Sequence, residues 1–100
     1  TCFGSVDFNE SNVDIAKNGK EITLTLNTKE IYSYRIYRID ALGREQILVF
    51  DAKTAEITSI LDKPLAFDSI VKYEIVCFIT SNPQVCRTIE KEVYVDGYLT

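Results

Sequence analysis

The sequence predicts an all-β protein, a seven-stranded antiparallel β-sandwich. Apolar and polar residues alternate in short runs, β-branched and aromatic residues are enriched in those runs, and turn residues separate them at spacings of about ten residues. This combination is typical of a sandwich, in which each strand buries one face. No helical pattern of useful length competes with it. After a first strand that ends near residue 18, the expected strands are 21–26, 31–39, 46–50, 56–61, 72–80 and a last strand that includes 92–95.

The chain length fits a single domain, residues 1–100, with 46% hydrophobic side chains. Domains typically contain about 50–250 residues, and a second domain would leave too few residues for each core. The chain contains no Met and begins with Thr1. We therefore expect a processed product or a module excised from a longer chain, and we interpret the sequence as a module.

The first hairpin is predicted from Asn18-Gly19, because both central positions of a tight type I′ turn need positive φ. With these two residues as the loop, Ile15 lies opposite Ile22 and Val13 lies opposite Leu24. Both pairs are apolar, which supports this register.

The second hairpin is predicted to turn within residues 40–44. One register aligns the residues of its two strands on both faces. The predicted pairs are Ile36 with Leu48 and Tyr34 with Phe50 on one face, and Tyr37 with Ile47 and Arg35 with Val49 on the other.

The third hairpin is predicted to turn within residues 81–84, because Pro83 cannot donate to a strand ladder and is expected in the loop. Neither phase of the strand that follows is fully apolar. One phase buries Arg87 and Lys91, and the other buries a glutamate. A bulge between Thr88 and Lys91 would reconcile the pattern.

Two stretches resemble fibronectin type III domains, which are immunoglobulin-like β-sandwiches. Tyr34-Arg35-Ile36-Tyr37-Arg38 is similar to their third-strand signature, and Asp62-Lys63-Pro64-Leu65 with Tyr73-Glu74-Ile75-Val76-Cys77 is similar to the stretch that leads into their sixth strand. The resemblance implies one sheet with the first, second and fifth strands and another with the third, fourth, sixth and seventh. It also implies a corner between Tyr73 and the preceding loop. It implies no single function. A true immunoglobulin domain is less favoured, because it needs a buried Trp and the chain has none.

Composition argues against several kinds of function. The net charge of −4 disfavours binding to nucleic acid. The absence of His removes the usual general base of serine and cysteine catalytic sites and a usual ligand of zinc sites, so we expect no enzyme. The acidic residues lack the dense, Gly-containing loop of a calcium site, and we expect neither a metal nor a cofactor. The longest apolar stretch, residues 75–79, is far too short to span a membrane.

Apolar residues are predicted on the outer face of the larger sheet, where polar side chains would be usual. They are expected to form a stripe with a polar rim, and such exposed patches commonly mark a contact surface. We therefore predict that this face packs on a neighbouring domain of the same chain or on another protein. Alternatively, long side chains such as Arg35 and Lys72 cover the stripe and leave no interface. The predicted contact residues are Tyr37, Ile47, Val49, Val76 and Phe78.

The three cysteines, Cys2, Cys77 and Cys86, allow at most one internal disulfide. Cys77 and Cys86 flank the third hairpin and could form a bridge if both side chains lie on one face. The alternative is a buried Cys77 and a Cys86 that keeps its thiol. Cys2 could pair with either if the N-terminal segment runs beside the seventh strand.

One motif points to modification. Asn9-Glu10-Ser11 is an acceptor sequon for N-linked glycosylation, which matters only in a eukaryotic secreted chain.

These observations favour a non-catalytic interaction or spacer module of a larger extracellular, cell-surface or virion protein. An alternative is an accessory domain of a secreted carbohydrate-active enzyme. A third, less favoured, is an immunoglobulin-like protease inhibitor that presents its loops. Fold class alone does not separate these functions.

Overall fold

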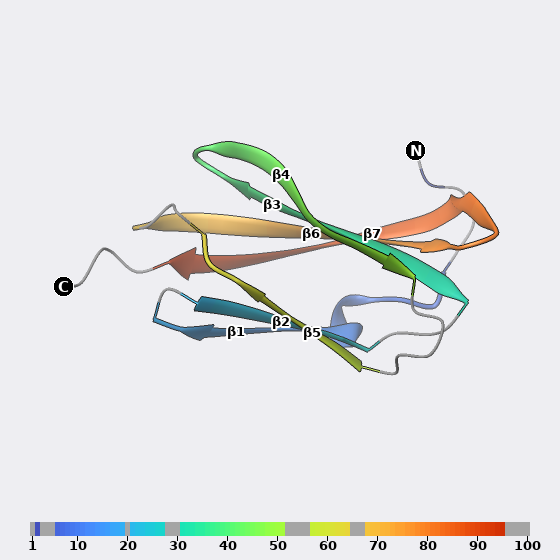
Figure 1. Ribbon diagram of the computed structural model, residues 1–100, viewed down its shortest axis with the longest axis horizontal. Helices are drawn as coiled ribbons and strands as arrows, with labels where there is room; N and C mark the ends of the chain where they lie inside the picture. The colour runs from blue at the N-terminus through green and yellow to red at the C-terminus, as the bar shows by residue number, and fades with distance from the viewer. Residues whose placement is uncertain are drawn as a thin grey trace.

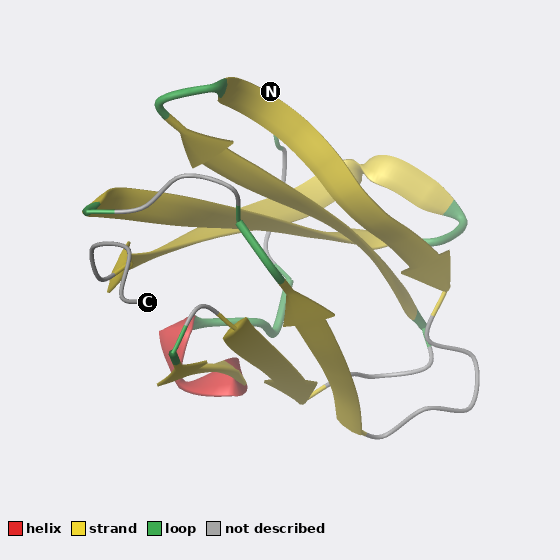
Figure 2. Ribbon diagram, turned by 60° about the vertical axis from the view of Figure 1, so that its left-hand side comes forward, coloured by secondary structure: helices red, strands yellow, loops and turns green. Residues whose placement is uncertain are grey.

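Two antiparallel sheets form the protein. The computed structural model describes residues 2, 6–19, 21–27, 31–51, 57–64 and 68–95, and the sheets lie as two layers (Figures 1 and 2). The prediction of an all-β fold with seven strands is confirmed, and the arrangement is compatible with a β-sandwich. A short 3-10 helix, η1 (Glu10–Asn12), precedes the first strand. The smaller sheet has the order β1 (Val13–Asn18), β2 (Glu21–Asn27), β5 (Ile57–Asp62), and the larger has the order β4 (Gly43–Asp51), β3 (Tyr32–Asp40), β6 (Ser69–Ile79), β7 (Asn82–Val95).

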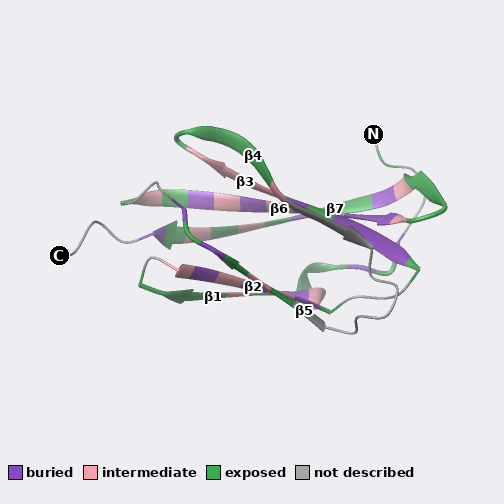
Figure 3. Ribbon diagram, viewed as in Figure 1, coloured by how far each residue is buried: buried purple, intermediate pink, exposed green. Residues whose placement is uncertain are grey.

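The core lies between the two layers and follows the period-2 pattern of the strands. Buried and less buried residues alternate along β2 and β6, as the purple bands of Figure 3 show. The N-terminal segment adds Phe8, whose ring meets that of Tyr34 edge to face with centroids 5.5 Å apart. The largest fully buried side chains include Tyr34, Tyr73, Phe8, Ile22, Leu24, Leu26, Ile36 and Ile75.

The first hairpin differs from its predicted register by two residues. Asn18 pairs with Glu21, so Gly19 follows the last residue of β1, and Ile15 lies opposite Leu24. Gly19 has φ +64°, the left-handed conformation that glycine adopts without steric cost. A two-residue slip leaves every side chain on its predicted face. The slip also places Val13 opposite Leu26, and both side chains are buried.

The second hairpin confirms three of its four predicted pairs. The pairs Tyr34–Phe50, Arg35–Val49 and Ile36–Leu48 are present. The register then shifts between Ile36 and Tyr37, and Tyr37 pairs with Gln46 instead of Ile47. The predicted pair of Tyr37 with Ile47 is therefore wrong, because a β-bulge inserts one extra residue into β4.

Two predictions about the third hairpin and β7 are also wrong. Ile79 pairs with Asn82, so Pro83 is the second residue of β7 and does not lie in the loop. β7 is an edge strand, where a residue without an N–H is tolerated. The pairing of β7 with β6 runs without a shift from Thr88 to Lys91, so the predicted bulge is absent there. Ile89 is buried while Arg87 is exposed and Lys91 half-buried, because the sheet edge lets these cations reach water.

No helix in the described part of the chain is long and apolar enough to cross a membrane.

Candidate functional site

The predicted contact face lies on the outer side of the larger sheet. Tyr34, Ile36 and Ile75 face the core, so the alternate positions on β3 and β6 face away from it. The neighbours Tyr37, Val76 and Phe78 therefore share the outer face. Tyr37 and Val76 are half-buried there, and Phe78 is only 7% exposed. The side chain of Val49 lies outside the described residues.

Ile47 does not share the outer face. The bulge in β4 places this residue between the two registers, and its half-buried side chain packs against the hydrophobic core. The prediction that Ile47 belongs to the outer apolar stripe is therefore wrong. A bulge changes the face that a side chain occupies, and the alternation of apolar residues alone does not reveal it.

Two arginines cover the aromatic rings of the outer face. The guanidinium carbon of Arg35 lies 4.6 Å from the ring centroid of Phe78. That of Arg44 lies 3.9 Å from the ring centroid of Tyr37. Cations stacked this closely on aromatic faces are attracted to the ring quadrupole. Long side chains thus cover much of the apolar stripe, as the alternative interpretation expected. Arg35 is one of the expected covering residues, whereas Arg44 was not expected.

Ion pairs orient two cations of the outer face, Arg44 and Lys72. Arg44 Nη2 lies 2.6 Å from Glu74 Oε1, and Lys72 Nζ lies 3.3 Å from Glu90 Oε2. The hydrogen bond to Glu74 raises the pKa of Arg44. Exposed pairs of this kind contribute little to stability, so they orient side chains more than they stabilise the fold.

Sequence reasoning missed an exposed apolar pair on the same face. Ile70 and Tyr94 are direct cross-strand partners on β6 and β7, and they are 59% and 46% exposed. Their neighbours Val71 and Val95 are buried, so strand alternation places the pair outward. The signal was present, but the sixth strand was expected to begin at residue 72 and actually begins at Ser69.

The disulfide joins Cys2 to Cys86, and Cys77 keeps its thiol in the core. The bridge between Cys77 and Cys86 that the sequence allowed is therefore not formed. Cys86 pairs with Phe78 in the β6–β7 register, which places Cys86 on the outer face and Cys77 on the inner face. Side chains on opposite faces of a sheet cannot form a bridge without backbone movement. The Cys2 pairing was among the alternatives that the sequence left open.

A buried polar network closes one end of the core. The Tyr73 hydroxyl donates to Asp62 Oδ2 at 2.5 Å, and Arg38 Nη1 donates to Asp62 Oδ1 at 2.7 Å. Arg38 also lies near Asp40 and Glu45, with nitrogen–oxygen distances of 3.5 and 3.1 Å. The corner expected between Tyr73 and the preceding loop thus takes the form of a hydroxyl–carboxylate bond to the end of β5.

The surroundings of Tyr73 and Arg38 raise the pKa of both groups. Burial raises the pKa of Tyr73, and the hydrogen bond to Asp62 raises it further. Burial lowers the pKa of Arg38, but the hydrogen bond and charge of Asp62, together with the charges of Glu45 and Asp40, outweigh this effect and leave the pKa raised. Both groups therefore keep their protons. The two bonds to Asp62 join β3, β5 and β6, and breaking them would leave a buried carboxylate poorly satisfied.

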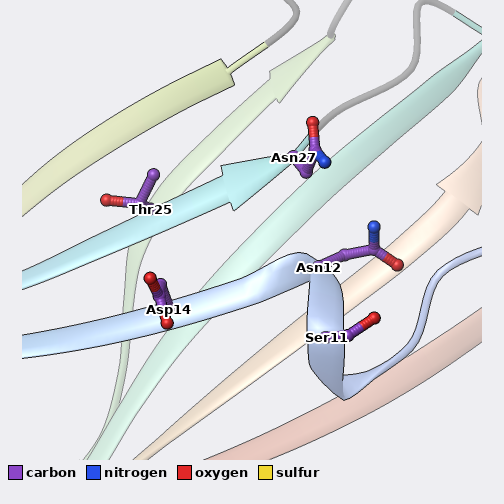
Figure 4. Close-up of a pocket in the computed structure, with 5 residues that line it drawn as sticks. All are labelled: Ser11, Asn12, Asp14, Thr25 and Asn27. Carbon is purple, nitrogen blue, oxygen red and sulfur yellow. The ribbon is translucent and has the colours of Figure 1, made fainter.

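A shallow polar groove lies on the outer side of the smaller sheet (Figure 4). Its volume is about 220 Å³. Thr25 and Ser59 add a hydroxyl–hydroxyl contact of 3.2 Å on this face. Hydroxyls, amides and a single carboxylate could hydrogen-bond a small polar ligand, and no cluster of metal-ligating side chains occurs among the described residues. The lining residues are Ser11 and Asn12 of η1, Asp14 of β1, and Thr25 and Asn27 of β2.

Comparison of the chain with protein-family models, with curated proteins and with solved structures finds no match.

Proposed function

We propose that this chain is a non-catalytic interaction or spacer module of a larger extracellular, cell-surface or virion protein. It packs on a neighbouring domain or on another protein through the outer face of the larger sheet. The observation that carries this proposal is the exposed cross-strand pair of Ile70 and Tyr94. This pair shares its face with two arginine-covered aromatic rings.

The chemistry of this face suits a protein partner. Aromatic residues and Arg are enriched in the centres of protein interfaces, and Tyr and Arg often dominate their binding energy. The Arg44–Tyr37 stack presents a flat, preorganised surface with one exposed cation. Preorganised side chains lose little conformational entropy on binding. The pair Ile70 and Tyr94 adds apolar area at the end of this surface.

The finer fold assignment supports the same proposal. The two sheets contain the strands that a fibronectin type III-like domain would place in each, and Tyr73 is bonded to the end of β5. Domains of this type serve as spacers and as binding surfaces, and fold alone does not choose between these uses.

The Cys2–Cys86 disulfide supports the extracellular part of the proposal. Structural disulfides form and persist in oxidising compartments and are rare in the cytosol.

A second candidate, an accessory domain of a secreted carbohydrate-active enzyme, draws on the groove of the smaller sheet. Its hydroxyl and amide lining matches the hydrogen-bonding capacity of sugar hydroxyls. The two candidates use opposite sheets, so one set of variants separates them.

Cross-linking in the whole protein tests the proposal. Lys72 lies two positions from Ile70 on the same strand face and reports on the contact. We expect cross-links from Lys72 to residues outside the module in the wild type, and their loss in the variant I70S/Y94S. Leu61, which is 56% exposed on the smaller sheet, provides the matched control variant L61S. Absence of such cross-links in the wild type, or their persistence in I70S/Y94S, would contradict the proposed contact.

A further inference from the structure

The sequon Asn9-Glu10-Ser11 is exposed and lies between two buried residues. All three residues are exposed, whereas Phe8 before them and Val13 after them belong to the core. It is the only sequon in the chain, since no other Asn is followed two positions later by Ser or Thr. The folded protein therefore holds its one acceptor asparagine at the surface, where a bulky glycan can be accommodated.

The local geometry uses the carbonyl oxygen of Asn9. Asn9 Oδ1 accepts from the Ser11 backbone N–H at 3.0 Å and also from the Ser11 hydroxyl. The Asn9 backbone N–H donates to Asn12 Oδ1 at 3.0 Å, which completes the cap of η1. No hydrogen bond of the Asn9 side-chain nitrogen, Nδ2, occurs within the described part of the chain. The atom that a glycan would modify is thus the one that the cap does not need.

We propose that Asn9 is an N-linked glycosylation site. The donor is a lipid-linked oligosaccharide diphosphate, supplied with its transferase by the secretory pathway. Asn9 Nδ2 forms the bond to the anomeric carbon of the first sugar and loses one proton. The bond between that carbon and the diphosphate oxygen breaks, and the lipid diphosphate leaves with the electron pair.

The modified side chain remains compatible with the fold. A glycosylated asparagine keeps its carbonyl oxygen, so both bonds from Ser11 to Oδ1 can persist. The glycan would lie beside Ser11 and Asn12, which line the groove on the smaller sheet. It would cover this side of the module and leave the outer face of the larger sheet accessible.

This inference draws on the proposed extracellular location, but it is independent of the contact face. The test expresses residues 1–100 behind a cleavable secretion signal in eukaryotic cells, and measures intact mass in medium and cell lysate before and after peptide N-glycosidase treatment. We expect most molecules to carry a glycan that the enzyme removes, with Asn9 converted to Asp.

Two variants at one position provide matched controls. Ser11→Thr keeps the sequon and should keep the glycan. Ser11→Ala removes the sequon but retains the backbone N–H that bonds Asn9 Oδ1, and it should carry no glycan. Wild-type molecules that contain the Cys2–Cys86 disulfide yet no glycan would overturn the inference, because the disulfide shows that they passed through the oxidising compartment. A glycan that persists in Ser11→Ala would overturn it as well. Neither result would bear on the contact face.

Discussion

The disulfide between Cys2 and Cys86 leads to a stability prediction with a definite magnitude. The bridge joins residues with a sequence separation of 84. In the chain-entropy description, closing a loop of this length lowers the entropy of the unfolded chain and raises its free energy by about 4.5 kcal/mol at 25 °C. Domains are stable by only about 5–15 kcal/mol in total. We therefore expect the double variant C2A/C86A to lose about 2–5 kcal/mol of unfolding free energy.

Equilibrium unfolding in urea, with and without a thiol reductant, measures this loss. The wild-type midpoint should fall on reduction, and the midpoint of C2A/C86A should not respond. Cys77→Ala is the matched control, because it removes a buried sulfur and leaves the bridge intact. Its midpoint should still fall on reduction. A wild-type midpoint that ignores reductant, or alkylation that finds Cys77 inside the bridge, would refute this reasoning.

Two further predictions concern the core and its polar end. Tyr73→Phe removes the hydroxyl that donates to Asp62, and should lower the unfolding free energy by about 1–3 kcal/mol, measured by urea unfolding. The fold raises the pKa of Tyr73, so Tyr73 in the unfolded chain loses its proton at a lower pH than in the folded protein. The contribution of Tyr73 to the free energy of unfolding is therefore fully present below the ordinary tyrosine pKa of about 10 and is lost as the pH rises above it. The decline in wild-type stability above about pH 10 should therefore be shallower in Tyr73→Phe by up to about 1.4 kcal/mol per pH unit, and an equal slope would contradict the assignment. Ile47→Ala should cost about 1–3 kcal/mol because this side chain packs on the core, whereas a change below about 0.5 kcal/mol would place Ile47 on the surface.

Much of the fold could be predicted because strand alternation is a local signal. Tyr34, Ile36 and Ile75 are buried in the phase that the pattern predicts. The second hairpin kept its register from Tyr34 to Ile36, where the pairs Tyr34–Phe50 and Ile36–Leu48 are both apolar. The first hairpin slipped by two residues because a slip of two preserves both faces, so burial alone could not distinguish the registers.

The candidate site was harder to predict, because its residues depend on non-local geometry. The bulge that turns Ile47 inward has no signature in the alternation of β4. The stacking of Arg44 on Tyr37 depends on the position of Glu74, which lies on another strand. The pairing of Cys2 with Cys86 depends on the path of the N-terminal segment. The outward position of Ile70 could have been predicted from strand alternation. It was missed because β6 begins at Ser69 and the strand was expected to begin at residue 72.

The central claim is that the outer face of the larger sheet makes a protein contact, and hydroxyl-radical footprinting tests it most directly. Tyr94 and Ile70 are the exposed apolar reporters on this face, and Leu61 on the smaller sheet is the internal reference. The isolated 100 residues and the whole protein would be labelled under the same conditions and compared by mass spectrometry. The proposal predicts that labelling of Tyr94 and Ile70 falls several-fold in the whole protein while labelling of Leu61 is unchanged. Equal labelling of Tyr94 and Ile70 in both samples would contradict it.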